Sequence, residues 1–172
     1  MYTFETSYDL KAMTALARGL RKTVRHKKSL RTHIFGWVVV VLALMLSMPL
    51  GKESYSIGIR EIITWLAVIA IVVVLLWEDV INGYIALRRI MPGLEKSTVT
   101  FHETGYRSVT AVGESDFRYD TIQLIAEDRD YFVFIFGPSH AQVYDKRSLS
   151  GGSVEAFGMF LSEKTGRSRI QI

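Results

Sequence analysis

The sequence contains no cysteine, and only 3 of its 172 residues are proline. The missing thiols exclude disulfide bonds, thiolate metal ligands and cysteine nucleophiles, and with them a disulfide-stapled secreted fold. The four histidines lack metal-ligand spacing, and the chain has no HExxH motif, P-loop, dinucleotide fingerprint or G-x-S-x-G elbow. We therefore predict that the protein is not an enzyme, holds no metal or cofactor and has no recognisable small-molecule substrate.

Charge is absent from two long stretches, although 22% of the residues are charged. The first is Ile34–Leu50 and the second begins at Ile62. Each is close to the roughly 17–25 residues that cross a bilayer. A buried helix of a soluble protein is the alternative, but such a helix normally has a polar stripe, which Val38–Leu46 lacks. We predict a retained transmembrane hairpin over 32–91, with spans at about 34–50 and 60–81.

Positive charge is concentrated before the first span. Residues 1–31 contain two acidic residues and eight basic ones, which are Lys11, Arg18, Arg21, Lys22, Arg25, Lys27, Lys28 and Arg31. Because this excess adjoins an apolar span, it indicates membrane topology and anionic lipid rather than nucleic acid. The segment between the spans has balanced charge, so the positive-inside rule predicts both termini in the cytoplasm, with Trp37 and Trp77 at the inner interface.

The segment 1–31 has two helical faces. Leu10, Met13, Leu16 and Leu20 recur at helical spacing, and basic residues recur on a different face. Such a helix can lie in the headgroup plane, or it can pack on the soluble domain, and the pattern leaves both open. Before it, residues 2–6 alternate and predict a short strand. The candidate contacts to anionic lipid in this segment are Arg18, Arg21, Lys22, Arg25, Lys27 and Lys28.

The end of the second span carries two acidic residues, Glu78 and Asp79. We expect them to lie in the hydrated headgroup region or to pair with Lys27, Lys28 or Arg31 and brace the hairpin. The helix itself is expected to continue to about Met91, where Pro92 and Gly93 stop it.

Strand-like alternation begins after that point. Runs at 97–103, 106–112, 117–126, 131–136 and 141–144 are separated by turn residues, and a helix capped by Ser153 follows. Five short antiparallel strands with one C-terminal helix predict a cytoplasmic α+β domain over 94–172, a half-barrel like a pleckstrin-homology (PH) domain. A domain this small has a marginal core, so we expect the N-terminal strand, the membrane surface or a second copy to cover part of the sheet.

Motifs across the chain are similar to those of the YcxB-like family of bacterial membrane proteins of unknown function. They are F-x-x-x-G-Y, Y-D-T-I, D-Y-F-V-F, K-R-S-L and F-x-x-F-L, with matching residues Phe101, Gly105, Tyr119, Asp120, Ile122, Tyr131, Phe132, Lys146, Arg147, Phe157, Phe160 and Leu161. The resemblance implies a multi-pass protein of the bacterial plasma membrane with a PH-like domain. It implies no activity and no site.

Few residues of the C-terminal domain suggest chemistry. Lys146 and Arg147 follow a predicted strand and are candidate contacts for an anionic lipid headgroup, with a solvated strand end as the alternative. Ser139, His140 and Asp145 lie close together along one predicted turn and strand, and proximity in the chain is not triad geometry. The leading hypothesis is a non-enzymatic, membrane-tethered module that binds a protein partner or its own copy, and the alternative is sensing of anionic lipid headgroups.

Overall fold

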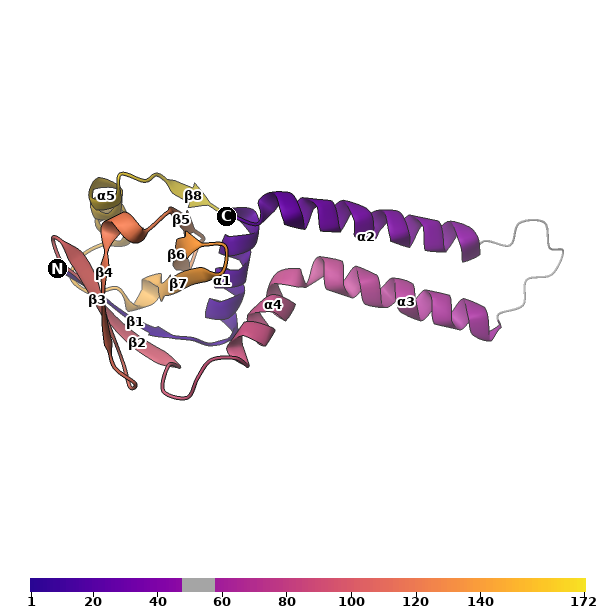
Figure 1. The fold of residues 1–172 in the computed structure, drawn as a ribbon, viewed down its shortest axis with the longest axis horizontal. Helices are drawn as coiled ribbons and strands as arrows, with labels where there is room; N and C mark the ends of the chain where they lie inside the picture. The colour runs from indigo at the N-terminus through magenta and orange to yellow at the C-terminus, as the bar shows by residue number, and fades with distance from the viewer. Residues whose placement is uncertain (48–57) are drawn as a thin grey trace. The chain divides into compact units, whose positions relative to one another are not determined.

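The computed structural model describes residues 1–47 and 58–172, which form two compact units (Figure 1). We call residues 1–26 together with 79–172 the β unit, and residues 27–78 the hairpin unit. These boundaries differ from the predicted division into 1–31, 32–91 and 94–172, because the N-terminal segment folds with the C-terminal one. The predicted connecting segment and the end of the first span, at 48–57, lie outside the described residues.

The first sheet of the β unit joins the two ends of the sequence. Its strands are β1 (Tyr2–Ser7), β2 (Lys96–Phe101), β3 (Gly105–Thr110) and β4 (Glu114–Arg118), antiparallel and in that order. Strand β1 pairs with β2 along its whole length, from Tyr2 opposite Phe101 to Ser7 opposite Lys96. The predicted N-terminal strand therefore exists, and it forms the edge of this sheet beside β2.

The second sheet contains β5 (Leu124–Glu127), β6 (Tyr131–Gly137), β7 (His140–Asp145) and β8 (Arg169–Gln171), in the order β7-β6-β5-β8. Strand β8 runs parallel to β5, whereas the other pairs are antiparallel. The predicted single strand over 117–126 was wrong, because a 3-10 turn at Tyr119–Thr121 carries the chain from the first sheet to the second. The described residues thus contain eight strands in two sheets of four, whereas six were predicted, one at the N-terminus and five in the C-terminal domain.

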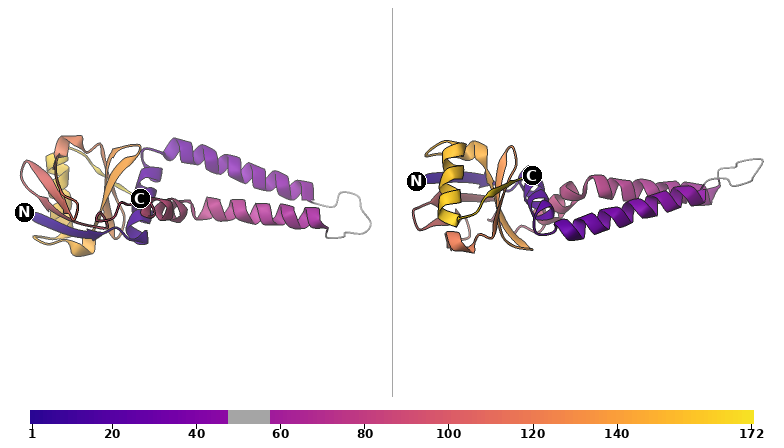
Figure 2. Two further views of the ribbon diagram at one scale, coloured as in Figure 1. Left: turned by 60° about the horizontal axis from the view of Figure 1, so that its bottom comes forward. Right: turned by 90° about the horizontal axis from the view of Figure 1, so that it is seen from above.

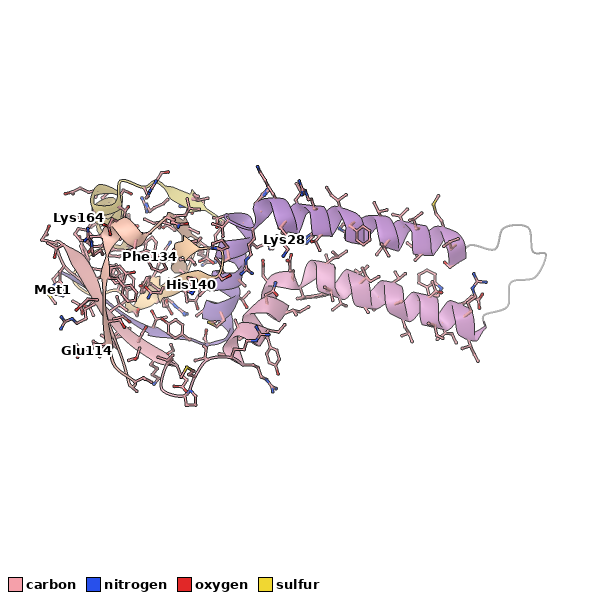
Figure 3. The ribbon with its side chains drawn as sticks, in the orientation of Figure 1. Met1, Lys28, Glu114, Phe134, His140 and Lys164 are labelled. Carbon is pink, nitrogen blue, oxygen red and sulfur yellow. The ribbon has the colours of Figure 1, made fainter. Side chains whose placement is uncertain are left out.

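Aromatic rings fill the space between the sheets. The centre of the Phe101 ring lies 4.9 Å from the ring centres of both Tyr106 and Phe157. Phe134 belongs to the same core (Figure 3). Helix α5 (Val154–Thr165) closes this core with Phe157 and Leu161, and Ser153 Oγ accepts the Ala156 N–H as the predicted N-cap.

Helix α1 (Leu10–Lys22) packs on the other face of the second sheet (Figures 1 and 2). Its Ala12, Ala15 and Leu20 form a buried cluster with Val133 and Val143 of β6 and β7. Asp9 caps the helix by accepting the Ala12 N–H at 2.8 Å. Of the two alternatives for this amphipathic helix, the structure has the one in which the apolar face packs on the folded domain.

The hairpin unit contains α2 (His26–Ser47) and α3 (Ile59–Leu76), which run side by side (Figures 1 and 2). Both are long and apolar enough to cross a membrane, and of their apolar side chains only Val40 and Val68 are buried. Where they approach, a Cβ on Gly36 would lie 2.8 Å from Leu75 Cδ2. The expected unbroken helix to Met91 was wrong: α3 ends at Leu76 and α4 (Glu78–Leu87) begins after Trp77.

Candidate functional site

The predicted lipid contacts Arg18 and Arg21 are engaged within the β unit. Arg21 forms two hydrogen bonds to the carboxylate of Asp79, at 2.6 and 2.7 Å, and Arg18 lies 3.7 Å from the same carboxylate. Arg18 also lies 3.6 Å from Asp128. Asp79 therefore pairs with α1, rather than with the later lysines or Arg31, and these contacts join α1 to the start of α4.

Glu78, the other acidic residue at this point, contacts polar groups inside the hairpin unit. Its Oε2 accepts the Ser29 hydroxyl at 3.2 Å and lies 3.5 Å from His33 Nδ1. His33 Nε2 is in turn 3.2 Å from the carbonyl oxygen of Leu75. These contacts link the first turns of α2 to the break between α3 and α4 through Ser29 and His33, two partners that the sequence pattern did not suggest.

The remaining basic residues near α2 are exposed. Arg25 donates to the Pro138 carbonyl oxygen at 2.8 Å. Lys22, Lys27 and Lys28 form no ion pair with any residue that the structure describes. Lys22 is the last residue of α1. Lys27 and Lys28 lie in the first turn of α2, ahead of the apolar stretch of that helix (Lys28 is labelled in Figure 3). These three cations are the predicted contacts that stay open to an external anion.

Lys146 is held inside the β unit. Its Nζ lies 2.6 Å from Glu127 Oε1, 2.6 Å from the Asp128 carbonyl oxygen and 4.7 Å from the centre of the Phe132 ring. Arg169 and Gln171 of β8 donate to the other oxygen of Glu127, at 2.9 and 3.1 Å. With its donors committed and its side chain only 11% exposed, Lys146 anchors β5 to the turn after β7 and is not available to a headgroup.

Arg147, by contrast, points outward with its side chain 63% exposed. It binds the carboxylate of Asp145 through Nε and Nη2, and Asp145 also accepts the Arg147 backbone N–H. These hydrogen bonds hold the pKa of Asp145 below its ordinary value. Asp145 is thus committed to Arg147 rather than to His140, and Lys146 and Arg147 do not converge on one anion site.

A groove on the β unit, which the sequence analysis did not find, has a volume of about 450 Å³. It lies among α1, the segment that follows α4, the neighbouring strands β3 and β4, and β7. Its lining residues are Tyr8, Met13, Leu16, Arg89, Ile90, Met91, Leu94, Ser108, Thr110, Gly113, Ser115, Phe117, Ala141 and Gln142. These residues come from five separate parts of the chain, so no local pattern in the sequence could reveal the groove.

Hydrogen bonds fix the amide of Gln142 in this groove. Its Oε1 accepts the hydroxyls of Tyr106 and Tyr144, at 3.1 and 2.5 Å. Burial raises the pKa of both tyrosines, so both keep the protons that they donate. The amide nitrogen of Gln142 has no such partner within the described chain, where no buried side-chain nitrogen is unpaired, so it is accessible from the groove.

The residues that the structure describes contain no cluster of three His, Asp or Glu side chains able to hold a metal ion. Ser139 lies exposed in the turn between β6 and β7, and His140, also exposed, begins β7 (His140 is labelled in Figure 3). Of the predicted contacts, Lys22, Lys27 and Lys28 are thus open in the structure, whereas Lys146 is held inside the β unit, and no sequence pattern indicated the groove.

Comparison with known proteins gives one match. Residues 101–161 match the family of YcxB-like proteins, which confirms the predicted resemblance over that part of the chain. The matched segment runs from the end of β2 into α5 and thus includes β3 and β4 of the first sheet and β5, β6 and β7 of the second. No curated protein and no solved structure matches the chain.

Proposed function

We propose that the protein is a bacterial inner-membrane protein whose hairpin spans the bilayer and holds the β unit, a PH-like half-barrel, at the cytoplasmic face as a binding module. The single observation that carries this proposal is the pairing of β1 with β2. The chain leaves the β unit after α1, forms the hairpin unit and re-enters the β unit at Asp79. If α2 and α3 each cross the bilayer, both ends of the hairpin must lie on the side where that one sheet has folded.

Charge supports the cytoplasm as that side. Lys22, Lys27, Lys28 and Arg31 directly precede the apolar part of α2, and Arg88 and Arg89 follow α4. Cytoplasmic flanks of membrane helices carry this excess of positive charge. The PH-like assignment rests on the strands β2 to β7 followed by α5, an element order that the sequence predicted in outline, with β8 added after the helix.

A protein partner or a second copy is the proposed ligand class of this module. Exposed apolar side chains on the β unit, Met159 of α5 and Val112 between β3 and β4, are suited to such a contact, with Met159 66% exposed. A photo-crosslinking amino acid at position 159 or 112 in the full-length protein in cells tests this. We expect a discrete adduct, at twice the protein's mass if the partner is a second copy. Matched probes at the exposed polar positions Thr121 and Ser139 should give none, and the absence of adducts at 159 and 112 would contradict the proposal.

Sensing of anionic lipid is a second candidate, favoured by the open cations Lys22, Lys27 and Lys28. The protein can be extracted with its surrounding lipid in polymer-bounded discs. If these cations gather anionic lipid, the discs will be enriched in phosphatidylglycerol relative to the whole membrane. The triple change to Gln should remove the enrichment, while the matched change Arg147→Gln should retain it. Equal lipid composition in all three proteins would overturn this candidate.

A further inference from the structure

The groove combines an apolar floor with two nitrogen hydrogen-bond donors, the guanidinium of Arg89 and the amide of Gln142. Met13, Leu16 and Leu94 contribute apolar surface, and Phe117 contributes a ring. Its volume of about 450 Å³ lies within the roughly 300–1,000 Å³ typical of small-molecule sites. The groove therefore fits the apolar body of a small amphiphile better than a folded protein surface.

The polar groups of the groove favour an anion. Arg89 forms no ion pair with any described residue, and the lining that the structure describes includes no carboxylate. The Gln142 amide nitrogen adds donors whose direction is fixed by the two tyrosine hydroxyls on its oxygen. A guanidinium and an amide donor together match the two oxygens of a carboxylate.

From this we infer that the groove binds a long-chain fatty acid, with the acyl chain on the apolar floor and the carboxylate at Arg89 and Gln142. A single unpaired arginine balances one negative charge, which favours a carboxylate over the phosphate of a lysophospholipid. The inference goes beyond the proposed binding of a protein partner, since the groove contains neither Met159 nor Val112 among its lining residues.

Photo-labelling of the full-length protein in phosphatidylcholine nanodiscs tests the site. A diazirine-bearing palmitic acid would be photolysed there and the labelled residues mapped by mass spectrometry. We expect label on groove residues such as Leu94 and Phe117, and also on the exposed apolar residues of α2 and α3. The hairpin label reports membrane insertion and serves as the internal standard, so the proposed membrane function and the groove can fail separately.

Variants of the two polar groups sharpen the test. Arg89→Gln should lower the ratio of groove label to hairpin label about tenfold, the scale of one charge-assisted hydrogen bond. Arg88→Gln is the matched control, because Arg88 contacts the Tyr84 hydroxyl and does not line the groove. Gln142→Glu keeps an acceptor for the tyrosines but places a carboxylate in the groove, and should abolish the label there.

Competition identifies the anion. Unlabelled palmitate should displace the groove label at least tenfold more effectively than methyl palmitate, which has the same chain without the charge. Label confined to the hairpin, an unchanged ratio in Arg89→Gln, equal displacement by the methyl ester, or stronger displacement by lysophosphatidic acid would each overturn the assignment.

Discussion

The two units use the same kind of residue in opposite ways. In the β unit, Phe101 is fully buried among other rings, whereas Phe35 of α2, in the hairpin unit, is 70% exposed. Of the most apolar stretches of α2 and α3, only 6% of the residues are buried. The β unit thus buries its aromatic core within the chain. The apolar side chains of the hairpin unit require an apolar environment outside the chain, which we propose is the lipid bilayer.

The largest expected effect comes from the aromatic residues. Phe101→Ala should lower the free energy of unfolding of the β unit by about 3–5 kcal/mol, because it opens a cavity in a packed core. Phe35→Ala should leave that free energy almost unchanged. Denaturation of the full-length protein in detergent, followed by tyrosine circular dichroism, measures this, since the described tyrosines lie in the β unit and the three tryptophans in the hairpin unit. Equal losses in both variants would contradict the comparison.

The second largest expected difference in stability is between substitutions of Lys146 and Arg147, two neighbouring basic residues. Lys146→Met removes one partner of the buried Glu127 carboxylate and should destabilise the β unit by about 2–3 kcal/mol, with Arg169 retaining part of the stabilisation. Arg147→Gln changes an exposed pair and should have a much smaller effect at neutral pH. The same denaturation measurement decides between them, and a larger loss in Arg147→Gln would show that the assigned roles are reversed.

Substitution of one glycine in each unit, Gly83 and Gly36, allows the tightness of helix packing in the two units to be compared. A Cβ on Gly83 of α4 would lie 2.8 Å from the backbone nitrogen of Thr14, so Gly83→Ala should separate α4 from α1 at a cost of about 1–3 kcal/mol. A Cβ on Gly36 would meet the flexible end of Leu75, which can move aside, so Gly36→Ala should cost less. Thermal unfolding of both variants in the same detergent tests the order, which the reverse ranking would refute.

The smallest effect concerns pH. Hydrogen bonds from Arg147 lower the folded-state pKa of Asp145, so their stabilisation is present above the unfolded pKa of about 4 and is lost as the pH falls through the folded value. The small stability difference between the wild type and Arg147→Gln should therefore shrink as the pH falls below about 5. Unfolding curves of both proteins at a series of pH values measure this stability difference. A difference that increases as the pH falls would contradict the assigned role of the Asp145–Arg147 pair.

Strong periodic patterns made part of this structure predictable. The run Tyr131–Phe136, the two apolar helices and the Ser153 cap were all predicted, since each depends on neighbouring residues. The corner at Tyr119–Thr121 and strand β8 were missed, because alternation continues through the corner and β8 forms only by pairing with β5. Lys146 and the groove were missed for the same reason, as their partners are distant in the sequence.

The topology of the hairpin is the central claim, and the absence of cysteine allows a clean test of it. Single cysteines at Ser54, Ser139 and Ser168 would be treated in intact bacterial cells with a membrane-impermeant maleimide. The account predicts that the cysteine at position 54 reacts in intact cells, while those at 139 and 168 react only after lysis. Labelling of 139 and 168 in intact cells, with 54 protected, would contradict it.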